Sequence, residues 1–196
     1  MGSREKILSA IRQSKPEAVE LETGPYTPER TGDLVGSFAA TLESIGGRCT
    51  VLDDRIALEA FLAEEGQKGA RMVNGIKATP GYNLEAVRSS EARELESVQV
   101  AILQGELGVA ENGAIWVTEE ALGHRILPFI TQGLVLVLAQ SRIVATMHDA
   151  YEQLAVDEPG YGVFIAGPSK TADIEQSLVI GAHGPVAMQV LILKDQ

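Results

Sequence analysis

The chain has 196 residues, of which 45% are hydrophobic and 22% are charged, and its formal net charge at pH 7 is -11. This length and composition suit one globular domain with its own core, and the acidity argues against binding to the phosphate backbone of nucleic acids or to an anionic membrane. The single cysteine, Cys49, excludes an internal disulfide and an iron–sulfur cluster held by these residues alone.

The first 29 residues are predicted to form a helix followed by a linker that crosses the surface as a strap. Ile7, Leu8 and Ile11 recur at helical spacing and predict a helix over 3–13. Residues 14–29 are rich in Pro, Glu and Thr and show no periodicity. The amino terminus lacks the apolar run of a signal peptide, and the longest apolar run, 134–139, is too short to span a bilayer. We therefore expect a cytoplasmic protein without membrane insertion.

Residues 30–196 are predicted to form a single α/β domain. Apolar positions every three or four residues predict a helix over 30–45, which ends at the glycine pair Gly46-Gly47. The remaining expected elements are helices at 54–64, 147–155 and 172–180, and strands at 49–52, 70–73, 98–103, 113–118, 134–138, 142–145, 161–166 and 186–193. Because strands alternate with helices and several strands are wholly apolar, the pattern predicts a mostly parallel sheet flanked by helices.

The segment 163–175 is the strongest candidate for a ligand-binding site. An apolar strand ends at Gly167, and a helix is expected to begin near Thr171, whose hydroxyl can cap it. The loop between them is expected to lie beyond the carboxyl end of a strand of the sheet, where α/β proteins bind ligands. Ser169, Lys170 and the free backbone N–H groups of the helix start would then line a cup suited to phosphate or carboxylate. Asp173 lies in the first turn, where it complements the helix dipole. The same residues also fit a capped helix after a tight turn, with no ligand.

A second candidate segment, 105–113, combines glycines with two carboxylates between two strands. Glu111 could serve as a catalytic acid or base, or could accept a hydrogen bond from a ligand hydroxyl. Asn112 and Gly113 would allow a ligand to approach the backbone closely. The alternative is a hairpin turn at Asn112-Gly113 with solvated glutamates.

The three histidines do not predict a metal site. No cluster of metal-binding side chains emerges from the sequence around His124, His148 or His183. His183 lies in a turn bounded by glycines and is the most plausible ligand-binding histidine, although a structural role is the stronger interpretation.

Four segments together resemble the lactate utilization protein C family, whose defining unit is the LUD domain. They are Gly-Val-Ala-Glu-Asn-Gly-Ala at 108–114, Ile-Val-Ala-Thr at 143–146 with Asp149-Ala150, Gly-Pro-Ser-Lys-Thr-Ala-Asp-Ile-Glu at 167–175 and Gly-Ala-His-Gly-Pro at 181–185. The resemblance covers roughly residues 95–193. The family commonly has Thr-Gly-Thr where this chain has Asn112-Gly113-Ala114, so the hydroxyl groups of that motif are absent here.

The resemblance implies a fold similar to the group of ribose-phosphate isomerase, glucosamine-phosphate deaminase and CoA-transferase. It also implies a role in oxidising L-lactate to pyruvate, as the subunit without an iron–sulfur cluster, alongside iron–sulfur partner proteins. No cofactor is then expected on this chain, and a homo-oligomer is compatible with this role. The alternative function is a stand-alone enzyme or binder for a small anionic metabolite, phosphorylated or carboxylated, such as a nucleotide, a phosphosugar or a CoA ester.

Overall fold

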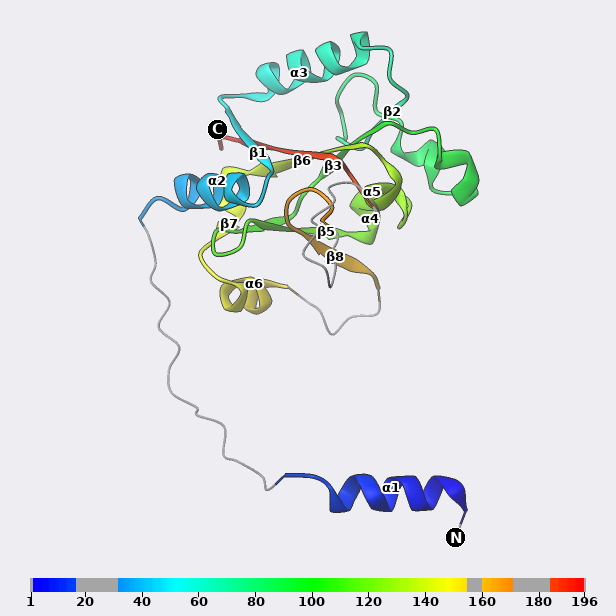
Figure 1. Ribbon diagram of the computed structural model, residues 1–196. Helices are drawn as coiled ribbons and strands as arrows, with labels where there is room; N and C mark the ends of the chain where they lie inside the picture. Colours follow the sequence, from blue (N-terminus) through cyan, green and yellow to red (C-terminus); the bar gives the residue numbers. More distant parts are fainter. Residues whose placement is uncertain (1, 17–31, 155–159, 171–183, 196) are drawn as a thin grey trace.

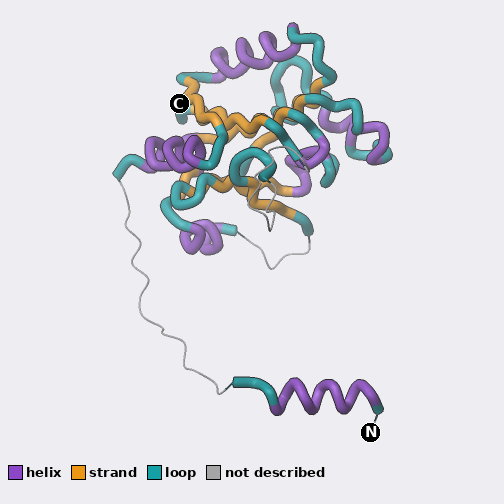
Figure 2. The backbone as a smooth tube through the Cα atoms, in the orientation of Figure 1, coloured by secondary structure: helices purple, strands orange, loops and turns teal. Residues whose placement is uncertain are grey.

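The chain folds around two β-sheets that pack face to face, as seen in a computed structural model that describes residues 2–16, 32–154, 160–170 and 184–195 (Figures 1 and 2). The first sheet has five parallel strands in the order β1-β9-β6-β3-β2. These strands are β1 Arg48–Leu52, β2 Met72–Asn74, β3 Val100–Gln104, β6 Gly133–Ala139 and β9 Ala187–Leu193. The expectation of a mostly parallel central sheet flanked by helices is therefore confirmed.

The second sheet has four strands in the order β7-β4-β5-β8 and is mixed in direction. They are β4 Leu107–Val109, β5 Ala114–Thr118, β7 Ile143–Val144 and β8 Gly162–Ile165. Strand β7 runs parallel to β4, whereas β5 runs antiparallel to both β4 and β8. The strands of this sheet lie in the segments that connect the longer parallel strands β3, β6 and β9. They are short, and a tight turn joins β4 to β5.

Helices α3 Arg55–Gln67 and α6 Met147–Gln153 cover the outer faces of the paired sheets. The other longer helices are α2 Leu34–Ser44, which packs into the main core, and α1 Ser3–Gln13, which has no buried residue. The short ones are α4 Glu119–Leu122 and α5 Leu127–Ile130, with 3-10 turns at Leu84–Val87, Ala92–Leu95 and Gln140–Arg142. In Figure 1, α3 lies above the parallel sheet and α6 lies below the second sheet.

The alternation of side chains along the buried strands explains this layering. In β6, Val135 and Val137 pack with Leu58 and Leu62 of α3 on one face of the parallel sheet. On the other face, the even-numbered leucines of β6 join Ile115 of the second sheet in the main core, which also holds the α2 side chains Phe38 and Leu42. A strand buried on both faces has to be apolar throughout, which is why β6 and β9 read as uninterrupted apolar runs.

Acidic and hydroxyl side chains fix the starts of the helices. Asp33 accepts a hydrogen bond from the Gly36 backbone N–H at 2.8 Å, and Asp54 accepts one from Ala57 N–H at 2.8 Å. Thr146 caps α6 through the Asp149 N–H at 3.2 Å. Each cap satisfies a backbone donor that the helix itself leaves without a partner.

Candidate functional site

The segment that starts at Gly167 lies elsewhere in the fold than the sequence suggested. Its preceding strand, β8, pairs antiparallel with β5 in the second sheet. The expectation that this loop follows a parallel strand at the carboxyl rim of the main sheet is therefore wrong. An apolar run of four or five residues predicts a buried strand but carries no information about its direction or its partner.

Part of the expected anion cup can be located. Gly167 has φ of +70° and is buried, and a Cβ built there would lie 3.0 Å from the Ile45 carbonyl oxygen, so glycine is required. The Ser169 N–H donates to the Pro185 carbonyl at 2.9 Å, and Lys170 is exposed. Thr171, Asp173 and His183 lie outside the described residues. The Ser169 amide is thus committed to the protein, and the ligand-binding role of this segment stays a prediction.

The Glu111–Gly113 segment forms the β4–β5 turn. Glu111 accepts a hydrogen bond from Met147 N–H at 3.0 Å and so holds the first residue of α6. Asn112 accepts one from Ala114 N–H at 3.0 Å, and Gly113 has φ of +68°. Since β4 and β5 are antiparallel, the hairpin interpretation of this segment is confirmed. The carboxylate of Glu111 therefore supports an adjacent helix.

The two predicted segments nevertheless lie beside the same helix end. A Cβ built on Gly113 would lie 3.4 Å from Ile45 Cδ1, and one built on Gly167 would lie 3.1 Å from Ile45 Cγ1. Ile45 directly follows α2. The structure therefore brings the β4–β5 turn and the Gly167 loop together at the carboxyl end of α2, where both glycines lie close to its last residues.

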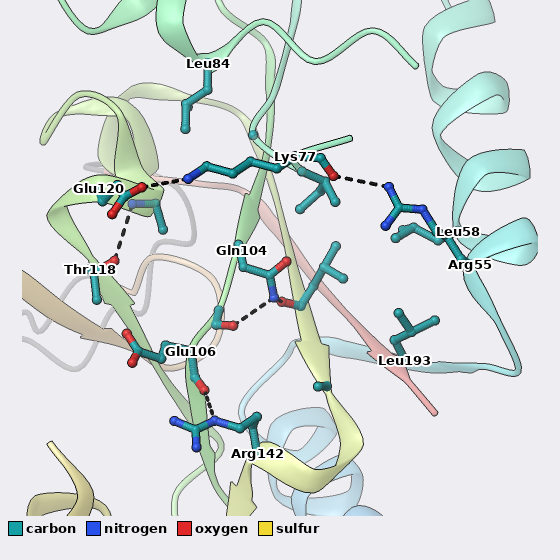
Figure 3. Close-up of a pocket in the computed structure, with 16 residues that line it drawn as sticks. Arg55, Leu58, Lys77, Leu84, Gln104, Glu106, Thr118, Glu120, Arg142 and Leu193 are labelled. Carbon is teal, nitrogen blue, oxygen red and sulfur yellow. Dashed lines mark hydrogen bonds and ion pairs between the residues drawn. The ribbon is translucent and has the colours of Figure 1, made fainter. Parts of the chain in front are cut away.

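A cavity, here called the strand-end cavity, opens at the carboxyl ends of the parallel strands and has a volume of about 600 Å³. In open α/β sheets this edge is where ligands bind, and the volume is in the usual range for small-molecule sites. Its walls combine an apolar interior with charged side chains, shown in Figure 3. The lining residues are Arg55, Leu58, Gly75, Ile76, Lys77, Leu84, Gln104, Gly105, Glu106, Thr118, Glu120, Ala121, Val137, Ala139, Arg142 and Leu193.

A buried asparagine shapes the wall that follows β2. Asn74 is fully buried and donates through Nδ2 to Thr79 Oγ1 at 3.0 Å and to the Pro80 carbonyl at 3.1 Å. Its Oδ1 accepts from Ile76 N–H at 3.0 Å. These bonds replace the ladder hydrogen bonds that the chain gives up where β2 ends, and they fix the 75–80 loop over the cavity.

Two of the three cations lining the cavity are committed to its rim. Lys77 Nζ lies 2.7 Å from Glu120 Oε1, and this shared hydrogen bond is the main cause that raises the pKa of Lys77 and lowers that of Glu120. Arg55 donates to the Lys77 carbonyl at 3.2 Å and to the Ala78 carbonyl. Both pairs tie the 75–80 loop to neighbouring elements.

The third cation, Arg142, lies at the other end of the cavity. Its Nε donates to the Glu106 carbonyl at 2.9 Å, and the side chain is half-buried. Figure 3 shows Gln104 between this contact and the Lys77–Glu120 pair. One end of the cavity therefore carries an exposed ion pair, and at the other end the Arg142 guanidinium lies against the backbone of Glu106.

The sequence contained a signal for the strand-end cavity that motif reasoning did not use. Polar residues follow three of the predicted parallel strands within a few positions: Lys77, Glu106 and Arg142. Carboxyl ends of parallel strands meet at one edge of a sheet, so these residues could have been grouped before the structure was known. They were missed because they belong to three separate segments, each unremarkable alone.

Cys49, in β1, is poorly suited to redox or metal chemistry. Burial raises the pKa of its thiol to about 11, and the nearby Glu43 carboxylate adds to the effect. Across the described ranges, no group of three or more His, Cys, Asp and Glu side chains is placed to hold a metal ion. Nor is any helix in those ranges long and apolar enough to cross a membrane.

The fold and its strand-end cavity define an α/β protein with two packed sheets and a ligand-sized hollow at the carboxyl edge of the parallel one. The family model described as "LUD domain" matches residues 4–193. The chain therefore belongs to the LUD domain family, as the four sequence segments suggested.

Relatives and a solved structure agree with this assignment. "Lactate utilization protein C" of Geobacillus thermodenitrificans is 26% identical over 99% of this chain and 81% of its own length. The protein of the same name from Bacillus pumilus is 32% identical over 61% of this chain and 52% of its own, and that of Bacillus subtilis is 28% identical over 61% and 53%. The crystal structure of a DUF162 family protein from Deinococcus radiodurans matches with a TM-score of 0.63 and 17% identity, covering 82% of this chain and 96% of that one, and shows a shared fold.

Proposed function

We propose that this protein acts in lactate utilization, as the subunit without an iron–sulfur cluster in a cytoplasmic system that oxidises L-lactate to pyruvate. The observation that carries the proposal is the family match over 4–193, together with relatives named lactate utilization protein C. The iron–sulfur proteins of that system would be its partners.

The cysteine chemistry of the chain supports the non-redox role. Its 196 residues contain one cysteine, so they cannot supply the thiolates of a four-cysteine cluster. The raised pKa of Cys49 keeps that thiol protonated and a poor metal ligand at neutral pH. Electrons from lactate would then pass through a partner protein.

Deletion of the gene in its source organism tests the proposal. We expect growth on L-lactate to be lost, growth on glucose to be unchanged, and the intact chain supplied on a plasmid to restore growth on lactate. An affinity-tagged copy should co-purify with proteins that contain iron and acid-labile sulfide. Normal growth on lactate in the deletion strain, with no such partner recovered, would contradict the proposal.

The cations of the strand-end cavity favour a second candidate, a binder or enzyme for a phosphorylated or carboxylated small molecule. A ligand that binds only the folded state at about 100 times its Kd stabilises the protein by roughly 2.7 kcal/mol, which a thermal shift readily detects. A shift produced by nucleotides, phosphosugars or CoA esters and removed by Lys170→Ala would place the site at the Gly167 loop. A shift that survives this substitution would place it elsewhere.

A further inference from the structure

Arg142 and Glu106 place a donor and an acceptor for a ligand at one end of the strand-end cavity (Figure 3). At the other end, Lys77 and Glu120 satisfy each other at 2.7 Å. The rest of the lining includes the apolar side chains of Leu58, Val137 and Leu193, with the amide of Gln104 midway between the two ends. A ligand in this space would contact hydrophobic side chains along its body and polar groups near Arg142.

Arg142 is held in place while most of its hydrogen-bonding capacity stays open. A guanidinium carries several N–H donors in a fixed plane. Only Nε–H is used among the described residues, by the Glu106 carbonyl at 2.9 Å. That bond fixes the plane of the guanidinium and leaves both Nη groups available, which is the arrangement that binds a carboxylate or phosphate through two parallel hydrogen bonds.

Gln104 supplies an acceptor whose identity follows from its partners. One terminal atom of its side chain lies 3.0 Å from the Gly105 carbonyl and 2.9 Å from the Val137 carbonyl. Because both partners are acceptors, this atom must be the nitrogen, and Oε1 is then the atom directed away from them. No described residue donates to Oε1, which Figure 3 shows directed away from those two carbonyls and away from Arg142.

Glu106 adds a second acceptor next to Arg142. Its carbonyl receives the Arg142 hydrogen bond, while its exposed carboxylate has no ion-pair or hydrogen-bond partner among the described residues. A simple anion would be repelled by this carboxylate. A ligand that carries a hydroxyl or amine donor beside its anionic group would instead satisfy Glu106 and Arg142 together.

We propose that the strand-end cavity binds an organic anion with an apolar or aromatic body, whose carboxylate or phosphate pairs with Arg142 and whose neighbouring hydroxyl or amine donates to the Glu106 carboxylate. A cavity of about 600 Å³ is much larger than a three-carbon acid, so the ligand is larger than lactate. The inference rests on the cavity alone and holds whether or not the chain acts in lactate utilization.

Thermal shift and isothermal titration with three probes test this site on the full chain. The probes are 3-phenyllactate, which has a carboxylate, a hydroxyl and an aromatic body; 3-phenylpropionate, which lacks the hydroxyl; and adenosine 5′-monophosphate, which offers a phosphate. We expect 3-phenyllactate or the nucleotide to raise Tm, and L-lactate to bind more weakly than either. If the carboxylate is the ligand group, 3-phenyllactate should bind better than 3-phenylpropionate.

Two variants and a matched control locate the binding. Arg142→Gln should weaken binding about tenfold or more, the usual loss for a hydrogen bond to a charged group. Arg71→Gln is the control, because Arg71 also donates to a backbone carbonyl, that of Glu94 at 2.9 Å, but at the amino-terminal end of β2. Ala139→Phe adds bulk to the cavity wall without changing any charge and should abolish binding, which keeps the test decisive if Arg142→Gln fails to fold.

Each result bears on the proposal. Loss of binding in Arg142→Gln and Ala139→Phe, with Arg71→Gln unchanged, supports the site. The proposal is overturned if none of the probes binds, if binding survives Ala139→Phe or folded Arg142→Gln, or if 3-phenyllactate and 3-phenylpropionate bind equally and the nucleotide does not bind. None of these outcomes changes the expectation for growth on lactate.

Discussion

At the scale of single residues, Asn74 is the side chain on which the cavity wall depends most. Two of its three side-chain hydrogen bonds are buried and the third is partly buried, and Asn74→Ala removes them all while leaving the Ile76 N–H and the Pro80 carbonyl without this partner. We predict that Asn74→Ala lowers the free energy of unfolding by about 2–4 kcal/mol, measured by urea denaturation. Asn112→Ala, which removes one hydrogen bond at an exposed turn, should cost about 1 kcal/mol or less. Equal losses in the two variants would contradict this role for Asn74.

Cys49 gives a second prediction at this scale, about pH dependence. Its folded-state pKa of about 11 exceeds the ordinary value of 9.0, so the native thiol stays neutral over a wider range of pH. At about pH 8, iodoacetamide should alkylate the native protein roughly 100-fold more slowly than the urea-unfolded chain, because only the thiolate reacts. The native rate should keep rising with pH until about 11. A native rate that levels off near the unfolded chain's midpoint would show that the thiol is not shifted.

At the scale of elements, the local sequence pattern predicted which strands exist better than it predicted which strands pair with one another. The apolar runs of β6 and β9 identified two central strands because burial on both faces leaves no place for polar residues. The same reasoning located β8 but gave it the wrong sheet, since pairing depends on contacts distant in sequence. The three-residue strand β4, Leu107–Val109, was not predicted because it is too short to show a period. The candidate cup at 167–173 came from local spacing, whereas the strand-end cavity combines residues from strand ends throughout the chain and could not come from any one motif.

The β5–β8 pairing in the second sheet yields a prediction about packing. Trp116 of β5 faces Phe164 of β8 with ring centroids 4.8 Å apart, and a Cβ built on Gly162 would overlap the Trp116 ring. We predict that Gly162→Ala lowers the free energy of unfolding by about 1–3 kcal/mol through overpacking, and changes the near-ultraviolet circular dichroism of the single tryptophan. Gly160→Ala is the matched control, because a Cβ there has no atom within 4 Å. A neutral Gly162→Ala variant would mean that β8 does not pair with β5 as described.

At the scale of the whole molecule, the fold divides into a packed body and an amino-terminal helix that contributes nothing to the core. Helix α1 has no buried residue, and the side chains of Ile7 and Ile11 are 58% and 52% exposed. Phe38 in α2, by contrast, is fully buried between the sheets and the helix. The free energy of folding therefore comes from residues after α1, because stability follows the apolar area removed from water.

Deletion of residues 2–16 tests this division. We predict that the truncated protein keeps its free energy of unfolding within about 0.5 kcal/mol of the full chain, as surface changes away from packed features do. Phe38→Ala, as the contrasting variant, should lose about 3–5 kcal/mol. An isolated helix of this length is marginal in water. If α1 adds no stability to the body, its exposed apolar side chains, Ile7, Leu8 and Ile11, are available to bind a partner. A loss above about 1 kcal/mol on deletion would instead mean that α1 packs on the body, and the amino-terminal segment would then belong to the domain itself.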